Sequence, residues 1–483
     1  MSSIPLIDWN HNWINGEQVT STETVSVLNP ATGEVLGEVP SLSEDQVKAA
    51  VDAASAALPA WAGLTAKQRG DYLLAWGERI LQNVPELALL LSQEQGKALK
   101  EATGEIRGSV EILRWYAEEA KRAYGEIIPA SNPGQQLMVF REPVGVVGLI
   151  TPMNFPAATL MRKVAPALAA GCTAILKPAS TTSLIAVALF QHLMEIGLPK
   201  GVANLVTGSS SVIGGVLMKD SRVRKISFTG STEVGKRLMG QAAQTVKKLG
   251  LELGGNSPAI VFPDADLDKA ARDIVDNKFE NCGQVCNGIN LIYVHEDVHA
   301  QLVDKIVEHV KRLKVDYGTQ PDTDIGPLID QGAVRKVEAL VDDAVAKGAK
   351  VLLGGSRLVE GKFSQGSFFA PTVLDQVTAD MNITHEEIFG PVAPILTFKD
   401  EEEVLERANN TPYGLAAYFY TKDAARVYRL IQKLETGNIG VNGTSLAYVQ
   451  APFGGVKESG IGREGGRHGL DEYLESKYVA WTL

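Results

Sequence analysis

Two of the three cysteines in the 483-residue chain stand four residues apart in FENCGQVCNGIN, residues 279–290. Cys286 follows Gly-Gln-Val and precedes Asn-Gly. Such a glycine-bounded loop leaves backbone N–H groups free and the thiol approachable, as a reactive thiol requires. Cys286 is therefore a candidate nucleophile, although the residues alone leave open a cysteine that is merely exposed. The third cysteine, Cys172, begins the apolar run CTAILK and is expected to be a small buried residue.

A carboxylate at the end of an apolar strand is the second candidate for chemistry. Glu252 stands in LELGGNSP, residues 251–258. A carboxylate in this position is either the partner of a salt bridge or a base whose pKa is shifted by its surroundings. Taken alone, the residues favour the salt bridge.

The stretch FTGSTEVGKR, residues 228–237, follows a predicted strand and opens a predicted helix. Gly230 and Gly235 are spaced like the outer glycines of G-x-G-x-x-G, but Thr232 replaces the middle glycine. The stretch also matches the start of a P-loop, which then requires Ser or Thr where this chain has Arg237. The residues alone leave open a phosphate-binding turn or a plain connection between strand and helix.

No resident metal is expected. THEEIFGP, residues 384–391, contains a His-Glu pair, but Phe389 occupies the place of the second zinc-binding histidine. Cys282 and Cys286 have no further histidine or cysteine at ligand spacing.

Charge and composition exclude several classes of protein. The formal net charge is −11, and no basic patch stands out, so nucleic acid is not an expected partner. Three cysteines cannot form a disulfide framework. The start, MSSIPLIDWNHNW, lacks the regions of a signal peptide. No apolar run reaches about 18 residues, so no membrane helix is expected. These features predict a cytoplasmic protein.

The elements that must position these residues alternate between strand and helix. Short alternating runs fill the first 40 residues, helical periodicity marks residues 44–123, and residues 124–143 are predicted to be extended. Strands are then predicted at VGVVGLI, CTAILK, VANLVTG, KISFTG, GLELGG and PAIVF, with helices between the first five. This alternation predicts a parallel, doubly wound sheet, whose ligands lie beyond the carboxyl ends of its strands. A second α/β region is predicted after Cys286 from NLIYV, AQLVDKIVEHVKRLK, KVLLGG, PILTF and RVYRLIQKL.

Together these stretches resemble the aldehyde dehydrogenase superfamily. Eight motifs occur in the family's order over nearly the whole chain: NPATGEVLGEVP, TPMNFP, LKPAS, FTGSTEVG, LELGG, FENCGQVC, EEIFGPV and PFGGVKESGIGRE. The chain is most similar in look to succinate-semialdehyde dehydrogenases. The GQVCN segment and the HGLDEYL tail also resemble lactaldehyde and glycolaldehyde dehydrogenases.

The resemblance implies roles for three catalytic residues. Cys286 matches the nucleophile, which attacks an aldehyde to form a thiohemiacetal and then a thioester. The Asn154 side chain and the Cys286 N–H match the oxyanion donors, and Glu252 matches the general base. Members that transfer the acyl group to coenzyme A commonly lack this Glu, so its presence favours hydrolysis. Cys282 is expected to be a packing residue rather than a redox partner of Cys286.

The resemblance also implies a nicotinamide cofactor. Lys177 matches the residue that contacts the adenosine ribose, Glu387 the residue that holds the nicotinamide ribose, and Phe389 a ring packed near the nicotinamide. Met153 replaces the usual Trp, and Ser180 replaces the Glu of strictly NAD⁺-dependent members. A serine lacks the charge that repels a 2′-phosphate, so NADP⁺ is expected to be preferred, with NAD⁺ possible. The expected cofactor-binding residues are Met153, Lys177, Pro178, Ser180, Gly208, Gly230, Ser231, Gly235, Leu253, Glu387 and Phe389.

The resemblance indicates a short aldehyde as substrate. Arg162 matches an Arg that holds the carboxylate of succinate semialdehyde, and Ser445 is the second expected substrate contact. The alternative for Arg162 is a helix-surface Arg paired with an acid. A second Arg of semialdehyde members is replaced here by Asn290, which keeps lactaldehyde or another small aldehyde as the alternative substrate. A cofactor-binding protein without turnover and a thiol hydrolase without redox chemistry are further alternatives.

The expected domains follow the family. Residues 1–123 and 142–254 are predicted to form the dinucleotide-binding domain, and residues 255–454 the catalytic domain. Residues 124–141 and 463–483 are predicted to form an oligomerisation arm and a C-terminal strand that pairs with a neighbouring subunit. A homodimer or homotetramer is therefore expected.

Overall fold

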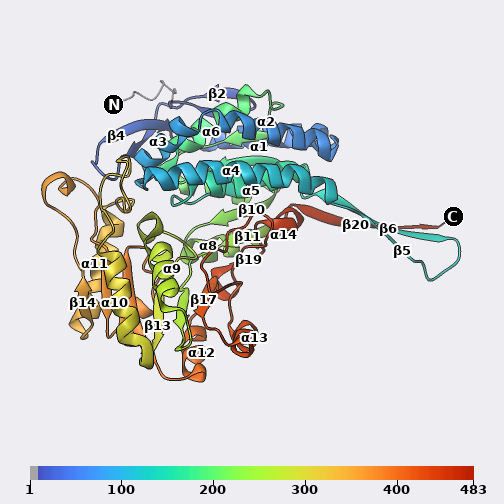
Figure 1. Ribbon diagram of the computed structural model, residues 1–483. Coiled ribbons are helices and arrows are strands. Elements are labelled where there is room, and N and C mark those ends of the chain that lie inside the picture. The colour runs from blue at the N-terminus through green and yellow to red at the C-terminus, as the bar shows by residue number, and fades with distance from the viewer. Residues whose placement is uncertain (1–8, 483) are drawn as a thin grey trace.

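The computed structural model describes residues 9–482, and residues 1–8 and 483 lie outside that description. The predictions for the first eight residues and for the last residue of the C-terminal strand are therefore not tested. The described chain forms two large sheets covered by helices and a long arm that projects away from them (Figure 1). The predicted α/β class, with a parallel doubly wound sheet, a second α/β unit and a small β arm, is confirmed. The exact residues at which the chain divides into domains stay a prediction.

The first sheet has eight strands, in the order β19 (Gly460–Ile461), β11 (Lys248–Glu252), β10 (Val223–Thr229), β7 (Val146–Ile150), β8 (Thr173–Lys177), β9 (Ala203–Leu205), β1 (Asn12–Ile14) and β2 (Glu17–Val19). Strands β11 to β9 pair in parallel, and the strands at both edges are antiparallel. They include the first five predicted strands, although β9 has only three residues. β7 and β8 are buried along almost their whole length, as is typical of a parallel sheet covered on both faces.

Eight helices accompany the first sheet: α1 (Glu44–Ala62), α2 (Ala66–Leu81), α3 (Val84–Gln95), α4 (Leu99–Glu119), α5 (Pro156–Ala170), α6 (Leu184–Glu195), α7 (Ser210–Lys219) and α8 (Thr232–Ala242). The first four confirm the helical periodicity of residues 44–123. α1 and α2 begin with capping boxes at Ser43 and Thr65, whose side chains accept a hydrogen bond from the first helical turn. Trp61 and Trp76 are fully buried in the core between these helices and the sheet.

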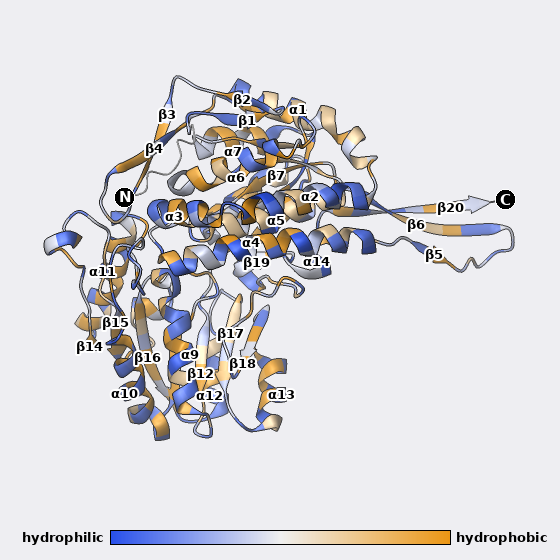
Figure 2. Ribbon diagram, turned by 45° about the horizontal axis from the view of Figure 1, so that its top comes forward, coloured by the Kyte–Doolittle hydropathy of each residue, from blue (hydrophilic) through white to orange (hydrophobic). Residues whose placement is uncertain are grey.

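The second sheet has seven strands, in the order β14 (Lys350–Leu353), β15 (Thr372–Asp375), β16 (Val392–Phe398), β13 (Leu291–His295), β12 (Pro258–Val261), β17 (Ala416–Tyr420) and β18 (Asn438–Val441). All neighbours pair in parallel except β14 with β15. The predicted strand PAIVF is β12 and belongs to this sheet. The helices of this unit are α9 (Leu267–Phe279), α10 (His299–Val310), α11 (Gln331–Ala346), α12 (Glu401–Asn409) and α13 (Ala424–Lys433). Figure 2 shows hydrophobic residues along β16 and mixed faces on the helices outside it.

The arm is a three-stranded sheet of β5 (Glu126–Ile128), β6 (Gln135–Pro143) and β20 (Leu474–Thr482), which follows α14 (Gly466–Asp471). The predicted extended region is confirmed. β20 pairs with β6 of its own chain over nine residues, with β6 in the middle of the arm. The prediction that the C-terminal strand pairs with a neighbour was thus incomplete, because one edge of β20 is used within the chain. A small hairpin of β3 (Thr24–Leu28) and β4 (Val35–Pro40) lies apart from these sheets.

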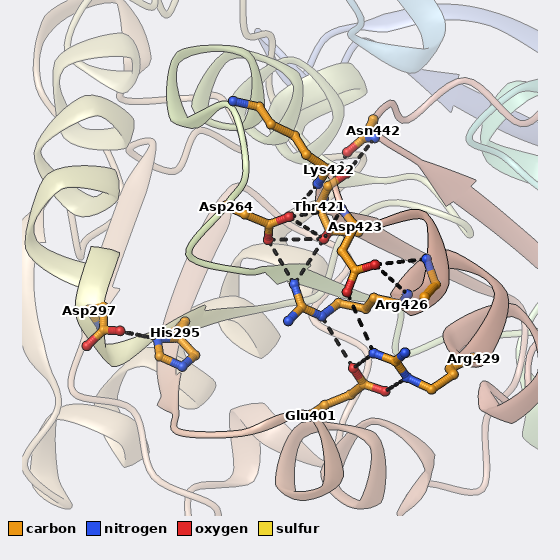
Figure 3. Close-up of polar contacts among 11 residues, drawn as sticks. Asp264, His295, Asp297, Glu401, Thr421, Lys422, Asp423, Arg426, Arg429 and Asn442 are labelled. Carbon is orange, nitrogen blue, oxygen red and sulfur yellow. Dashed lines mark hydrogen bonds and ion pairs between the residues drawn. The ribbon is translucent and has the colours of Figure 1, made fainter.

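An ion-pair network closes the carboxyl ends of β12, β17 and β18 (Figure 3). The Asp264 carboxylate accepts hydrogen bonds from the Thr421 hydroxyl at 2.8 Å, the Lys422 N–H at 2.6 Å and the Arg426 guanidinium at 2.8 Å. Glu401 accepts from Arg426 and, at 2.7 Å, from Arg429. Paired charges thus occupy the edge at which an open α/β sheet would otherwise bind a ligand.

Candidate active site

Cys286 and Glu252 face one cavity of about 610 Å³. Glu252 is the last residue of β11 and lies at the carboxyl edge of the first sheet. Cys286 precedes β13 and lies at the amino edge of the second sheet. The cavity is therefore placed between the two sheets, and Phe155, Tyr448 and Phe453 supply aromatic side chains to its wall.

A strained turn leads into the nucleophile loop. Asn281, Cys282 and Gly283 have φ angles of 49°, 57° and 74°, in the left-handed region that favours glycine. A Cβ on Gly283 would lie 2.1 Å from the carbonyl oxygen of Gly390, so no larger residue fits there. Cys282 is 2% exposed and belongs to the core of the second sheet. This burial agrees with the expected packing role.

Cys286 is a partly exposed residue in the cavity lining. Burial, followed by the negative charges of Glu252 and Glu387, raises its pKa to about 12. The thiol is therefore protonated at neutral pH in the protein without ligands. Cys172 is fully buried, and its thiol contacts the Tyr473 carbonyl oxygen at 3.4 Å, in agreement with the predicted core position.

Glu252 is 5% exposed, and among residues 9–482 neither of its carboxylate oxygens has a hydrogen-bond partner. The salt bridge that the residues alone favoured is thus not formed. Burial, followed by the charge of Glu464, raises the pKa of Glu252 well above its usual range, against the opposing charges of Lys163, Arg162 and Arg463. Such a buried carboxyl without partners at a cavity is typical of an acid or base in catalysis.

Asn154 follows β7, and its side-chain N–H donates to the backbone oxygen of Gln284 at 2.9 Å. Asn154 is 5% exposed and lies beside the cavity lining rather than within it. An amide carries two N–H donors, so one remains after this bond. This hydrogen bond ties Asn154 to the loop of Cys286, because Gln284 lies two residues before the cysteine.

Most predicted cofactor residues follow the carboxyl ends of parallel strands in the first sheet. Met153 follows β7, Lys177 ends β8, and Leu253 follows β11. Lys177 is 5% exposed, its ammonium donates to the Pro178 oxygen at 3.0 Å, and burial lowers its pKa to about 8. Ser180 opens a short 3₁₀ turn, Ser180–Thr182, and is partly exposed.

Two of the predicted cofactor-binding glycines leave no room for a larger side chain. A Cβ on Gly235 would lie 2.5 Å from Leu253, and a Cβ on Gly208 would lie 2.8 Å from Ser41. The N–H of Gly230 donates to the backbone carbonyl oxygen of Glu252 at 3.0 Å and is not free for a phosphate. Ser231 caps α8 and accepts from the Val234 N–H, so the N–H groups of the first turn of α8 point to this edge.

This edge fits a nicotinamide dinucleotide. The Thr151 and Thr229 hydroxyls have no partner within residues 9–482, and the Lys177 ammonium has one acceptor there. Ribose hydroxyls and phosphate oxygens supply partners for such donors. On the other side, Glu387 accepts from the Gly255 N–H at 3.2 Å, and burial raises its pKa to about 7. Phe389 lies in the same loop with a φ of 52°.

Arg162 and Ser445 both line the cavity of Cys286. The Arg162 guanidinium lies 5.7 Å from the centre of the Phe453 ring and contacts the Ala447 oxygen at 3.4 Å. Within residues 9–482 it forms no ion pair, and it is the only cationic side chain in the cavity lining. The alternative of an Arg paired with an acid is therefore wrong.

Asn290 does not line the cavity. Its buried side chain donates to Asn256 and to the Glu386 oxygen, at 2.5 Å and 3.1 Å, and accepts from the Ile388 N–H at 3.0 Å. It thus holds the loop that carries Glu387. The absence of an Arg at this position removes no charge from the cavity wall of this chain.

Several residues of the site were not found from the sequence. Lys163 pairs with Glu464 at 2.5 Å and donates to Ser227 at 3.0 Å beside Glu252. Glu464 closes the motif PFGGVKESGIGRE, and Phe155 directly follows Asn154, so both stood within segments already singled out. Tyr448 and Lys163 carried no comparable sequence signal. No group of three potential metal ligands occurs within residues 9–482, and none of the helices described there is long and apolar enough to span a membrane.

Known proteins resemble this chain over almost its whole length. A family profile described as "Aldehyde dehydrogenase family" matches residues 13–479. A glutarate-semialdehyde dehydrogenase of Pseudomonas putida is 48% identical over 98% of this chain and 97% of its own length. A succinate-semialdehyde dehydrogenase [NADP(+)] of Escherichia coli is 48% identical over 97% of both chains. The crystal structure of a succinate-semialdehyde dehydrogenase from Burkholderia pseudomallei has a TM-score of 0.97 at 45% identity, covering 100% of this chain and 99% of the other.

Proposed function

Because this chain belongs to the aldehyde dehydrogenase family, we propose that it oxidises a short aldehyde with a terminal carboxylate, and that succinate semialdehyde is its substrate. The observation that carries this proposal is that Cys286, Glu252 and the unpaired Arg162 line the same cavity. Family membership gives the reaction class, the oxidation of an aldehyde with a nicotinamide cofactor. The unpaired Arg162 in the cavity supports the proposed substrate class.

The reaction begins with Cys286. The thiol first gives its proton to solvent, and the thiolate sulfur then bonds to the aldehyde carbon. The electron pair of the broken carbon–oxygen π bond moves to the aldehyde oxygen, which becomes an oxyanion. The free N–H of the Asn154 amide and the Cys286 N–H stabilise that charge. A nicotinamide cofactor held by Lys177 and Glu387 would supply the oxidising chemistry, as the acceptor of the hydride that leaves the same carbon. The product on Cys286 is a thioester.

Glu252 completes the reaction. Its carboxylate takes a proton from a water molecule, whose oxygen bonds to the thioester carbon. The carbon–sulfur bond then breaks, which releases the acid and restores the thiolate. The raised pKa of Glu252 makes its carboxylate a stronger base than that of an exposed glutamate.

Arg162 accounts for the choice of substrate. Its guanidinium can bind a carboxylate with two parallel hydrogen bonds. It forms no ion pair within residues 9–482, although Glu252 and Glu464 line the same cavity. The relatives from Pseudomonas putida and Escherichia coli are named for semialdehydes of glutarate and succinate, which both carry a terminal carboxylate. Lactaldehyde lacks that group and is the second candidate.

The proposed cofactor is NADP⁺, with NAD⁺ as a weaker alternative. Lys177 can pair with a 2′-phosphate, and the Ser180 hydroxyl has no partner within residues 9–482. An acidic residue at position 180 would repel the phosphate, and the chain has Ser180 there.

The proposed assembly is a homodimer or homotetramer, because the arm leaves one edge of β20 unpaired in the described chain. Its apolar side chains are also exposed, with Ile127 at 85% and Trp481 at 53%. Light scattering at micromolar concentration tests this, and a monomer would contradict it. The cytoplasmic location stays a prediction.

The experiment that tests the function measures absorbance at 340 nm with succinate semialdehyde and NADP⁺. Stoichiometric formation of succinate and NADPH is the expected result. If the protein hydrolyses an ester but forms no NADPH or NADH with any semialdehyde, it is a thiol hydrolase, and the proposal is rejected.

A further inference from the structure

A buried ion pair lies beneath the oxyanion site. Lys97 connects α3 to α4, and its side chain is 0% exposed, while that of Glu105 on α4 is 2% exposed. The Lys97 ammonium lies 2.6 Å from the Glu105 carboxylate. Burying two charges costs several kcal/mol each, and apolar residues of similar size often serve stability as well or better. The pair therefore calls for an explanation other than stability.

Both partners of this pair contact the turn that carries Asn154. The Lys97 ammonium donates to the Asn154 backbone oxygen at 2.8 Å and lies 3.9 Å from the centre of the Phe155 ring. The Glu105 carboxylate accepts the N–H groups of Ala157 and Ala158 at 2.9 Å and 3.1 Å. α5 has no side-chain cap of its own, so Glu105 supplies the cap from another helix.

The same helix also contacts the nucleophile loop. Glu101 on α4 accepts the N–H of Asn281 at 2.9 Å, at the start of the strained turn before Cys286. The Asn281 side chain donates at 2.9 Å to the same Asn154 oxygen that Lys97 contacts. The Asn154 oxygen is thus held from two directions, once by Lys97 and once by the loop of the nucleophile.

We propose that Lys97, with Glu105, is a positioning residue for the oxyanion site: it fixes the Asn154 turn of the first sheet against the Cys286 loop of the second. Neither residue lines the cavity, so neither touches substrate. Loss of Lys97 frees the Asn154 turn to move relative to Cys286. A misplacement on the order of 1 Å costs roughly 100-fold in rate. The inference rests on the proposed function, because Asn154 matters only if an oxyanion forms.

The test compares Lys97→Met, Glu105→Gln and the double variant with the wild type. Lys97→Met is expected to lower kcat/KM for the aldehyde by about 10- to 100-fold. Hydrolysis of p-nitrophenyl acetate without cofactor, which needs the same nucleophile and oxyanion donors, is expected to fall by the same factor. The affinity for NADP⁺ and the rate of Cys286 alkylation by iodoacetamide should stay within about twofold, because neither needs an oxyanion donor. Lys100→Met is the matched control, since Lys100 is an exposed neighbour that pairs with Asp324 outside the site.

The double variant separates positioning from stability. Each single variant leaves one charge buried without its partner, which is destabilising. Removing both charges is expected to return the melting temperature toward the wild-type value, while kcat/KM stays low because Asn154 still lacks its donor. Recovery of kcat/KM to within about twofold of wild type in the double variant would overturn the proposal, and so would a wild-type rate in Lys97→Met. If a single variant does not fold, the double variant decides alone. A wild-type protein that oxidises no aldehyde would instead reject the proposed function.

Discussion

The side-chain amide of Asn154 donates to the backbone oxygen of Gln284 over 2.9 Å, and so joins the first sheet to the loop that ends in Cys286. The two residues are 130 positions apart in the chain. Through this bond the proposed oxyanion donor and the proposed nucleophile keep a fixed separation across the two sheets. The chemistry expected at the cavity depends on that arrangement, and the following predictions test its parts.

Glu252→Gln is expected to produce one burst of reduced cofactor and then stall. Without the base, water cannot attack the thioester efficiently, and steady-state turnover should fall by about 100-fold or more. Rapid-mixing absorbance at 340 nm measures both phases, and mass spectrometry would find the acyl group on Cys286. Cys286→Ala is the control and should show no burst. Full turnover by Glu252→Gln would remove Glu252 from the role of base.

Alkylation of Cys286 in the absence of cofactor should rise with pH without a plateau. The pKa of the thiol is raised to about 12 by burial and by the charges of Glu252 and Glu387. Below that pKa the thiolate fraction, which is the reactive form, increases tenfold for each pH unit. The rate of iodoacetamide labelling between pH 6 and pH 9 measures this. A plateau near pH 8 would mean that the thiol ionises far more easily than its surroundings indicate.

Ser180→Glu is expected to shift cofactor preference toward NAD⁺ by roughly 10- to 100-fold, or about 1.4–2.8 kcal/mol. A carboxylate at this position repels the 2′-phosphate of NADP⁺ and accepts from the ribose hydroxyls of NAD⁺. The ratio of kcat/KM for the two cofactors is the measure. Ser180→Ala is the control, because it removes the hydroxyl without adding charge and should shift the ratio less. A wild-type preference for NAD⁺ of a hundredfold would show that other residues decide.

Asp264→Asn is expected to lower the free energy of unfolding by about 1–2 kcal/mol and to leave activity unchanged. Partial burial opposes ionisation, but hydrogen bonds from Thr421 and Lys422 and the charge of Arg426 outweigh it and lower the Asp264 pKa. Asp264 lies beyond the carboxyl end of β12, whereas Cys286 lies at the amino edge of the same sheet. A variant with wild-type stability at pH 7 would show that the network adds nothing.

The sign of the pH dependence follows from the lowered pKa of Asp264. Its contribution to stability is present above its unfolded pKa of about 4 and is lost as pH falls through the folded value. The difference between wild type and Asp264→Asn should therefore shrink in acid. Urea unfolding at pH 7 and pH 3 measures this. Asp71→Asn is the control, because Asp71 makes only an exposed pair with Lys67 and should change stability by less than about 1 kcal/mol.

The parts of the fold and site that could be predicted from sequence are those set by local pattern. Alternating strands and helices gave the first sheet, and parallel strands bring the loops after β7, β8, β10 and β11 to one edge. The family resemblance assigned Lys177 and Ser231 to the cofactor and Glu252 to catalysis, and all three lie at or just after the carboxyl ends of these strands. The resemblance also assigned Arg162 to the substrate, whereas the helical pattern of α5 by itself did not show that this side chain lines the cavity.

The parts that could not be predicted depend on contacts between distant segments. Lys97 forms a hydrogen bond with Asn154, which is 57 positions away in the sequence, and Glu101 forms one with Asn281, which is 180 positions away. Neither contact leaves a periodic pattern in the sequence. The strain at Asn281 is likewise hidden, because the residue is not a glycine. The in-chain pairing of β20 with β6 was missed for the same reason, since the two strands are more than 300 residues apart.

The most direct test of the central claim is the ratio of kcat/KM for succinate semialdehyde to that for lactaldehyde, measured in the wild type and in Arg162→Ala. The proposal predicts a wild-type ratio well above one. In Arg162→Ala, KM for succinate semialdehyde should rise about tenfold or more, or roughly 1.4 kcal/mol of lost charge pairing, while lactaldehyde kinetics stay unchanged. Arg107→Ala, which removes an exposed charge from α4, serves as the control. A wild-type ratio below one, or an unchanged KM for succinate semialdehyde in Arg162→Ala, would contradict the proposed substrate.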